Sequence, residues 1–205
     1  MLNHAFMLSF ILVGASIPIR EVRWEALNVV YRSFSENKIS GCFISSGVLL
    51  GLYRDGELLT NDDDIDFTCP YQMQDRLSTV LDYPAWKTTR RYIKNKQTKF
   101  SLEKLGLTNY SGLMDIYFYN TTQNGILFDL SECNFWINST VLPVKLMIFK
   151  GRSLPVPNDP DKYLSDYYGG DWKITKPGWK GGWNRPVPLK TYNPWTESCD
   201  SSFTV

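Results

Sequence analysis

Histidine is almost absent from this sequence: the single one among 205 residues is His4, near the amino terminus. A Ser-His-Asp triad, a Cys-His dyad, a histidine-based zinc site and a histidine general base are therefore excluded from the rest of the chain. A basic excess is also absent, because 22 Lys and Arg residues face 21 Asp and Glu residues. Proteins whose main partner is the nucleic-acid backbone usually carry such an excess, so we expect no nucleic-acid partner. Chemistry must rest on carboxylates, lysines, hydroxyls, thiols or a bound metal.

The amino-terminal hydrophobic run, AFMLSFILVGA at residues 5–15, has about the length of a signal-peptide core. It is too short to cross a bilayer comfortably. Val13 and Ala15 are compatible with cleavage before Ser16, whereas the start MLNH lacks lysine and arginine. We predict a signal peptide or short anchor over residues 1–15, and an anchor of this kind is the only membrane attachment that we expect. A buried apolar segment is the alternative.

Cysteine is scarce, and no two cysteines form a Cys-x-x-Cys pair. The four residues are Cys42, Cys69, Cys133 and Cys199. Their wide spacing suits one or two disulfides better than a metal knuckle, and it suits buried free thiols equally well. Three triplets, beginning at Asn109, Asn120 and Asn138, match the N-glycosylation acceptor pattern. With the leader, they favour the secretory pathway, in the lumen of the ER or Golgi or outside the cell.

Helix-like and strand-like segments alternate along the chain, which predicts one mixed α/β domain over residues 20–172. Apolar spacing predicts a helix over residues 20–37, with Arg23 elsewhere on the helical wheel. Further helices are predicted over residues 48–53 and 71–82, and from Pro160 with Asn158 or Asp159 as the cap. Strands are predicted over residues 42–44, 62–68, 113–119 and 125–130. Residues 173–205, dominated by Gly, Pro and Trp, are expected to form an irregular extension over the domain.

The most informative stretch is the acidic segment NDDDIDF at residues 61–67. On a strand, Asp62, Asp64 and Asp66 would share one face, with Asp64 and Asp66 about 7 Å apart along it. Carboxylates that close repel each other unless a cation lies between them. Mg²⁺ or Mn²⁺ fits this requirement, because both prefer oxygen ligands. A solvated acidic loop or a calcium loop is the alternative, although the interleaved apolar residues argue against it.

Asp115 is the only charged residue in the run LMDIYFY at residues 113–119. Such a strand is mostly buried, and a buried carboxylate needs a cation or several hydrogen-bond donors. Alone, this aspartate would more often be a structural residue or a strand cap. Beside a second acidic strand, Asp115 is the natural third metal ligand or general base.

Ser45-Ser46-Gly47 lies where a predicted strand meets a predicted helix. Gly47 would let a phosphate approach the backbone, and the free N–H groups of the helix amino terminus would face the anion. A serine there is also an ordinary helix cap. Arg54 could reach the same phosphates, or it could pair with Asp55 and Glu57.

Residues 41–67, GCFISSGVLLGLYRDGELLTNDDDIDF, resemble the signature of the LicD/fukutin family, a branch of the nucleotidyltransferase superfamily typified by DNA polymerase β. The matching motifs are Ser46-Gly47, the Leu-Gly-x-x-Arg-x-Gly helix end at residues 50–56 and the acidic strand at residues 62–66. Met114-Asp115-Ile116 corresponds to the third acidic strand, and residues 141–172 resemble the carboxyl-terminal pattern. Ser45-Ser46-Gly47 departs from the Gly-Gly-Thr or Gly-Ser of many members.

This resemblance implies a nucleotidyltransferase fold, a mixed β-sheet flanked by helices. It also implies transfer of a phosphorylated alcohol, such as ribitol phosphate or phosphocholine, from a CDP-linked donor to a hydroxyl of a glycan or glycoprotein. Two Mg²⁺ or Mn²⁺ ions would be held by Asp64, Asp66 and Asp62, and Asp115 would complete a metal shell or take the acceptor proton. The implied donor-phosphate residues are Ser46, Gly47 and Arg54.

Two other functions suit the same sequence. The acidic site would equally serve a nucleotidyltransferase that moves CMP itself onto a phosphorylated acceptor. A catalytically silent glycan-binding or accessory relative is the third reading, favoured by the short length and opposed by the presence of Asp64, Asp66 and Asp115 together. The carboxyl-terminal aromatic residues would form either a sugar-stacking wall or ordinary packing; they are Tyr163, Tyr167, Tyr168, Trp172, Trp179 and Trp183.

Overall fold

The structure is a computed structural model that describes residues 19–81, 86–93, 96–104, 113–121, 126–129, 134–175, 192–193 and 198–199. The leader predicted over residues 1–15 lies outside this set. None of the described helices combines the length and the apolar character that a membrane span requires.

Five α-helices and eleven strands are described. The helices are α1 (Ile19–Glu36), α2 (Ser46–Leu50), α3 (Gln74–Val80), α4 (Asn138–Val141) and α5 (Pro160–Tyr168), with a π-helical turn η1 (Gly51–Asp55) and a 3₁₀ turn η2 (Tyr71–Met73). The strands are β1 (Phe43–Ile44), β2 (Asp66–Pro70), β3 (Trp86–Ile93), β4 (Lys96–Lys104), β5 (Met114–Thr121), β6 (Ile126–Asp129), β7 (Asn134–Ile137), β8 (Lys145–Phe149), β9 (Arg152–Val156), β10 (Tyr192–Asn193) and β11 (Ser198–Cys199).

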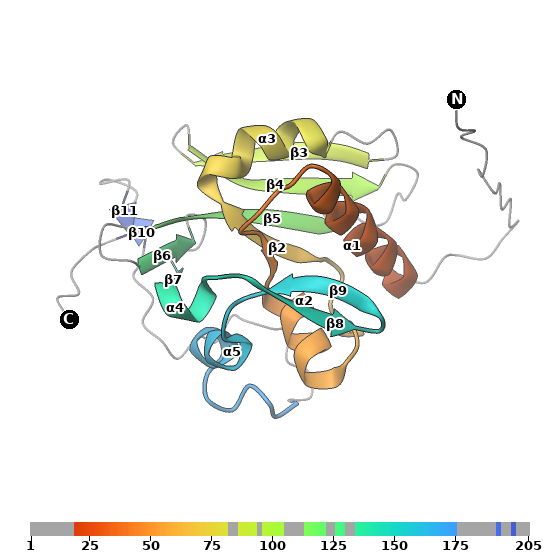
Figure 1. Cartoon of the computed structure of the whole chain (residues 1–205), viewed down its shortest axis with the longest axis vertical. Helices are drawn as coiled ribbons and strands as arrows, with labels where there is room; N and C mark the ends of the chain where they lie inside the picture. Colours follow the sequence, from red (N-terminus) through yellow and green to blue (C-terminus); the bar gives the residue numbers. More distant parts are fainter. Residues whose placement is uncertain are drawn as a thin grey trace, which may run out of the picture.

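Seven strands form one sheet in the order β1-β2-β5-β4-β3, with β6 paired to β5 and β7 to β6. The β2–β5 pair is parallel and the other pairs are antiparallel, so the sheet is mixed, as the sequence predicts. Helices α1 and α3 lie together over the sheet, and α2, α5 and the β8–β9 hairpin gather beyond its β2 side (Figure 1).

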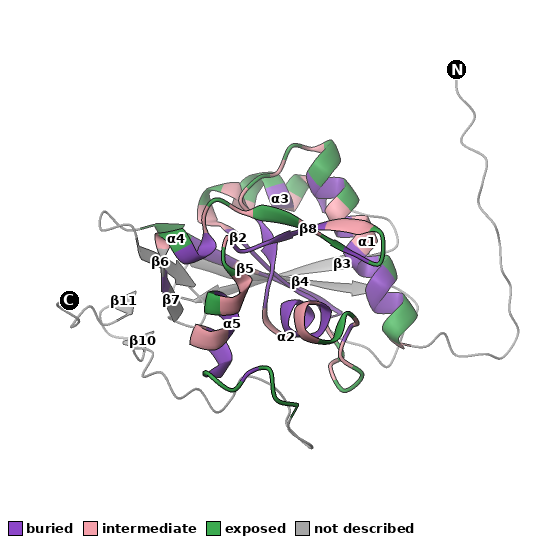
Figure 2. Ribbon diagram, turned by 60° about the horizontal axis from the view of Figure 1, so that its bottom comes forward, coloured by how far each residue is buried: buried purple, intermediate pink, exposed green. Residues whose placement is uncertain are grey.

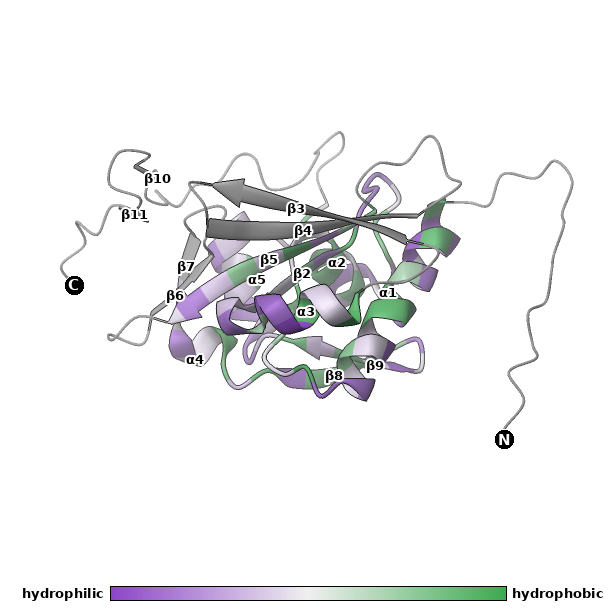
Figure 3. Cartoon of the chain, turned by 90° about the horizontal axis from the view of Figure 1, so that it is seen from above, coloured by the Kyte–Doolittle hydropathy of each residue, from purple (hydrophilic) through white to green (hydrophobic). Residues whose placement is uncertain are grey.

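The core lies between the sheet and its helices. Phe34 of α1 contacts Phe67 of β2 edge to face, with 5.3 Å between ring centroids. Figure 2 shows β2 as a buried strand with buried stretches of α1 and α2 around it. Seen from above, β5 passes from hydrophobic residues to hydrophilic ones toward β6 (Figure 3), which matches its exposed end at Asn120 and Thr121. The predicted acidic residues Asp66 and Asp115 lie on β2 and β5, which are neighbouring inner strands of this sheet.

Several predicted elements appear in the structure. Helix α1 matches the prediction for residues 20–37, and α5 begins at Pro160 with Asp159 as its cap, whose side chain accepts a hydrogen bond from the Lys162 amide at 3.0 Å. A proline in the first turn and an aspartate cap together satisfy amide groups at the helix start. The predicted helix over residues 71–82 is present as η2 followed by α3.

The acidic strand differs from the prediction. Strand β2 begins only at Asp66, so Asp62 to Ile65 belong to the loop before it rather than to the first half of a strand. Asp63 consequently does not lie on an opposite strand face, because one of its carboxylate oxygens is within 4.8 Å of those of Asp62 and Asp64. The loop is held by side-chain contacts that the strand pattern does not encode.

A disulfide joins Cys42 to Cys69 between the antiparallel neighbours β1 and β2. Both half-cystines are buried, at 4% and 0% exposure. One of the disulfides that the sequence allows is therefore present, and it lies three residues from Asp66. Cys133 and the side chain of Cys199 fall outside the described residues.

The predicted irregular extension over residues 173–205 is only partly described. Residues 170–174 form turns, and β10 pairs with β11 in a two-stranded ladder, so this segment has some regular structure. Trp179 and Trp183 lie outside the described residues.

Candidate active site

Asp66 and Asp115 are direct partners on the two parallel strands. Asp66 opens β2, Asp115 is the second residue of β5, and their Cα atoms pair in the register. The backbone amide of Asp115 donates a hydrogen bond to the carbonyl oxygen of Ile65 at 2.8 Å. The amide of Ile65 in turn donates to the carbonyl oxygen of Leu113 at 3.0 Å. The hydrogen bonding between these two strands thus extends one residue before β2, to Ile65. Both partner side chains are buried, with 8% and 6% of their surface exposed.

Asp64 completes a cluster with these two residues. One carboxylate oxygen from each of Asp64, Asp66 and Asp115 lies within 4.8 Å of the others. Burial, followed by the negative charges of Asp62, Asp115 and Asp63, raises the pKa of Asp64 to about 7. The three predicted aspartates therefore converge, and their mutual repulsion makes a cation at this point favourable.

Asp62 lies beside the cluster and pairs with an arginine. Its Oδ2 accepts a hydrogen bond from Arg23 Nη2 at 3.0 Å. Burial raises the pKa of Asp62, and the Arg23 charge opposes that rise. Asp62, Asp63 and Asp64 also form a group whose ligand oxygens lie within 4.8 Å of one another, so Asp62 is near enough to share a cation with Asp64.

The predicted phosphate-binding turn borders the same carboxylates. A Cβ added to Gly47 would lie 2.3 Å from Asp62 Oδ2, so only glycine permits this approach. Ser46 has a φ of 49°, in the left-handed region that glycine adopts more readily, and its hydroxyl lies 3.5 Å from the Tyr167 hydroxyl. The Ser45 hydroxyl accepts a hydrogen bond from Thr68 of β2 at 2.9 Å. The turn is thereby fixed to the acidic strand.

Arg54 pairs with its neighbour in the structure. Its Nε and Nη2 both donate to the Asp55 carboxylate at 2.7 Å, which is a bidentate ion pair. That contact raises the pKa of Arg54 and lowers the pKa of Asp55. Of the two alternatives drawn from the sequence, pairing with Asp55 is the one observed, and phosphate binding by Arg54 stays a prediction.

The aromatic residues of α5 pack rather than form an open wall. Trp136 stacks on Tyr163 with 4.6 Å between centroids, and Tyr163 stacks with Tyr167 at 6.1 Å. Tyr163, Tyr167, Tyr168 and Trp172 are all at most 8% exposed. Burial raises the pKa of Tyr168 well above its usual value, with Tyr167 and the acids Asp66 and Asp62 adding to the effect. Tyr168 therefore borders the acidic cluster while belonging to the core.

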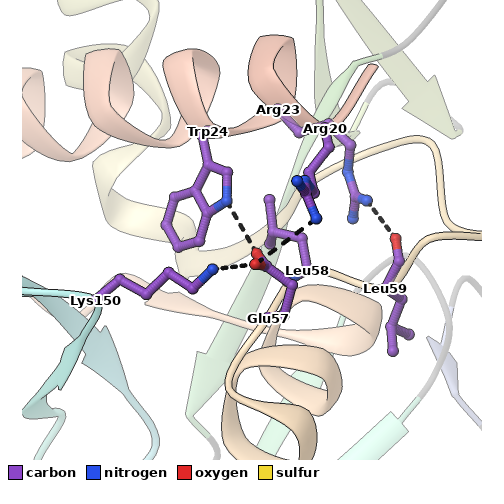
Figure 4. Close-up of polar contacts among 7 residues, drawn as sticks. All are labelled: Arg20, Arg23, Trp24, Glu57, Leu58, Leu59 and Lys150. Carbon is purple, nitrogen blue, oxygen red and sulfur yellow. Dashed lines mark hydrogen bonds and ion pairs between the residues drawn. The ribbon is translucent and has the colours of Figure 1, made fainter. Parts of the chain in front are cut away.

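Glu57 ties the segment before the acidic loop to two other elements (Figure 4). Its carboxylate accepts hydrogen bonds from Trp24 Nε1 at 3.1 Å and from Lys150, at the turn of the β8–β9 hairpin, and lies 3.9 Å from Arg20. The Lys150 contact, followed by hydrogen bonds from the Leu58 amide and Trp24, lowers the pKa of Glu57 to about 2. The polar contacts thus anchor the start of the acidic loop to α1 and the hairpin.

A comparison with protein families matches residues 40–159 to the model described as LicD/FKTN/FKRP, nucleotidyltransferase domain. The match covers more than half of the chain. The chain belongs to this family. It is therefore a transferase of nucleotidyltransferase fold, with the mixed α/β architecture described above, and it acts on nucleotide-linked substrates.

Two solved structures are similar to this LicD-family chain. One is the lincosamide antibiotic adenylyltransferase LnuA bound to lincomycin, with 16% identity, 65% of this chain and 78% of that chain covered, and a TM-score of 0.47. The other is ANT(2″)-Ia in complex with adenylyl-2″-tobramycin, with 13% identity, 77% and 81% covered, and a TM-score of 0.49. A comparison with curated protein sequences finds no match.

The carboxylates of this LicD-family site fit a divalent cation. Three carboxylate oxygens within 4.8 Å of one another suit the oxygen-only coordination that Mg²⁺ and Mn²⁺ prefer. The raised pKa of Asp64 points the same way, because the cluster without a cation resists full ionisation. The donor set is compatible with divalent-metal use.

Arg23 is the site residue that the sequence prediction missed. The helical wheel set it apart from the apolar residues of α1, whereas the structure buries it with 1% exposure. It precedes Ala26 by three residues and Leu27 by four, a spacing that places the three side chains on one helix face. That spacing is the signal by which the sequence could have located it.

Proposed function

We propose that this protein transfers a phosphorylated alcohol, of the ribitol phosphate or phosphocholine type, from a CDP-linked donor to a hydroxyl of a glycan or glycoprotein. The single observation that carries the proposal is the register pairing of Asp66 with Asp115, together with Asp64, on two parallel strands of a LicD-family domain. The donor class comes from the family resemblance, and the domain limits of 20–172 are part of the same proposal.

Asp64 and Asp66 would hold the divalent ions, with Asp62 close enough to contribute an oxygen. Asp115 would either complete a metal shell or act as the general base. A divalent cation bound there polarises phosphoryl oxygens and neutralises charge on the leaving CMP. The turn at Ser46 and Gly47 would receive the donor phosphates against its backbone N–H groups. Arg54 would join them only by exchanging its bidentate contact with Asp55.

In the transfer, the acceptor hydroxyl oxygen attacks the phosphorus that bears the alcohol. The bond between that phosphorus and the bridging oxygen of the diphosphate breaks, and CMP leaves with the electron pair. A carboxylate takes the hydroxyl proton, and Asp115 is the candidate because its neighbours Asp64 and Asp66 suffice to begin the metal shell. A histidine could not serve instead, because the sequence contains none between residues 19 and 175.

Replacing Asp66 or Asp115 by asparagine tests the proposal. Either variant is expected to lower the rate of CDP-alcohol-dependent transfer by about 10²-fold or more. Each removes a carboxylate that supports stabilisation of the charge that develops on the phosphoryl group during transfer. Calorimetric titration with Mn²⁺ should show weaker binding in parallel. Asp75→Asn, which removes an exposed acid on α3, is the matched control and should retain both properties. Unchanged transfer in the Asp66 and Asp115 variants would refute the assignment.

Isotopic label separates the proposal from transfer of CMP itself. With label in the donor phosphate next to the alcohol, the acceptor glycan is expected to become labelled. With label in the phosphate next to cytidine, free CMP should carry it. Label from the cytidine-side phosphate in the acceptor product would instead establish nucleotidyl transfer.

We further propose that the protein works in the secretory pathway, in the ER or Golgi lumen or outside the cell. The buried Cys42–Cys69 disulfide supports this, because disulfides persist mainly in oxidising compartments. The exposed acceptor residue Asn120 at the end of β5 supports it as well.

A further inference from the structure

Arg23 makes an unusual set of contacts for a residue on a surface helix. Its guanidinium donates hydrogen bonds to three backbone carbonyl oxygens, those of Leu59 at 2.7 Å, Asp62 at 2.9 Å and Asp64 at 2.9 Å. A fourth bond goes to the Asp62 carboxylate at 3.0 Å. Figure 4 shows the Arg23 side chain reaching from α1 to Leu59.

These contacts span residues 59–64 of the loop between η1 and β2. Leu59 lies near the start of the loop, Asp62 in its middle and Asp64 two residues before β2. Because β2 begins only at Asp66, strand pairing does not fix the backbone at Asp62 and Asp64. The planar guanidinium, with donors in a rigid fork, can hold several oxygens at once in a defined arrangement.

We propose that Arg23 is a positioning residue for the metal site: it holds the loop so that the Asp64 carboxylate meets those of Asp66 and Asp115. The inference rests on the proposed function, since it assumes that these carboxylates bind a divalent ion. Arg23 lies outside the family-matched residues 40–159, so helix α1 is assigned a part in the site that the matched segment does not contain.

Two effects of removing Arg23 oppose each other. Loss of a positive charge would make the cluster more negative, which by itself would tighten binding of a divalent cation. Loss of three backbone contacts would let the loop move, which would weaken binding because the ligands are no longer preorganised. Three of the four bonds go to neutral carbonyl oxygens, so the positioning effect is expected to dominate.

The test is calorimetric titration of Mn²⁺ into the full chain, with no substrate present. Arg23→Gln is expected to raise the Mn²⁺ dissociation constant about 10-fold or more, the usual effect of losing support behind a metal ligand. Arg23→Lys keeps the charge but not the fork, and is expected to weaken binding nearly as much. Arg32→Gln is the matched control: it removes an exposed cation further along α1, and should leave Mn²⁺ affinity unchanged.

The outcomes separate the inference from the proposed function. If the wild-type chain binds no Mn²⁺, the proposed metal site is wrong. If the wild type binds Mn²⁺ and folded Arg23→Gln binds it equally or more tightly, only the positioning role is wrong. Should Arg23→Gln fail to fold, as judged by thermal unfolding, Arg23→Lys decides: an affinity within twofold of wild type would overturn the inference.

Discussion

Asp64 is a carboxyl group whose ionisation the folded protein opposes. Its pKa of about 7 compares with an ordinary value of 3.8, and the causes are burial followed by neighbouring negative charges. Between these two values, the metal-free folded protein retains a proton that the unfolded chain releases. The free energy of unfolding should therefore increase as the pH falls from about 7 toward 4.

A pH series in the presence of a chelator checks this expectation. The melting temperature of the wild type is expected to rise from pH 8 to pH 5.5, relative to Asp64→Asn, which lacks the titrating group. The lowered pKa of Glu57 does not interfere, because Glu57 titrates below this range. In the same series, Mn²⁺ affinity should fall by up to about tenfold per pH unit below 7, since a proton competes for the ligand. Mn²⁺ affinity that is constant from pH 5.5 to 7.5 would contradict the prediction.

At the scale of single residues, the sequence allowed the acidic cluster to be predicted but not its support. Asp64, Asp66 and Asp115 were recognisable because carboxylates interrupt apolar strand-like runs. Arg23 was not, because an arginine in a helix is ordinarily exposed, and its burial depends on carbonyl oxygens about 40 residues away.

Among the elements, the first turn of α2 depends on one glycine, Gly47. The predicted Cβ of an alanine at position 47 would lie 2.3 Å from Asp62 Oδ2 and 3.0 Å from its Cγ. Asp62 would have to move, and its 3.0 Å contact with Arg23 would be lost. Gly47→Ala is therefore expected to lower the free energy of unfolding by about 1–3 kcal/mol, the range of overpacked sites.

Chemical denaturation with matched variants checks the effect of Gly47→Ala. Gly170→Ala is the control, because a Cβ at Gly170 meets no heavy atom within 4 Å, and it should change stability by less than about 0.5 kcal/mol. Equal stabilities of the two variants would show that the turn tolerates a side chain. Mn²⁺ affinity should decline only in the Gly47 variant.

Elements with strong local patterns were predicted well. Helix α1 has apolar residues at helical spacing, and α5 has both a capping aspartate and a first-turn proline. Strands β3 and β4 were not predicted, because their sequences, WKTTRRYI and KQTKFSLEK, lack a regular alternation of apolar and polar residues. The β8–β9 hairpin was missed as well, since its turn residues Lys150 and Gly151 have positive φ values of 49° and 76° without an Asn-Gly signature.

For the molecule as a whole, the acceptor triplets give a test of compartment. Asn120 is exposed at the end of β5, whereas Asn138 is half-buried and its Oδ1 is buried without a hydrogen-bond partner. In cells that secrete the full chain, Asn120 is expected to carry a glycan and Asn138 is not.

Glycan attachment at these two asparagines is measured by treating the protein with a glycan-removing enzyme and comparing its mobility in gel electrophoresis. Asn120→Gln should eliminate one mobility step, and Asn138→Gln should leave the pattern of the wild type. A wild-type chain whose mobility does not respond to the enzyme would count against the secretory location.

The Cys42–Cys69 cross-link also governs how the protein must be prepared. It joins Cys69 of the strand that begins at Asp66 to Cys42, the residue before β1, so two thiols in place of the bond would remove the covalent link at that edge of the sheet. Bacterial cytosol keeps thiols reduced, whereas the periplasm oxidises them. Recombinant material for kinetic work should accordingly come from the periplasm or from an eukaryotic secretion host, with the oxidation state of the pair verified before any loss of turnover is ascribed to a mutation.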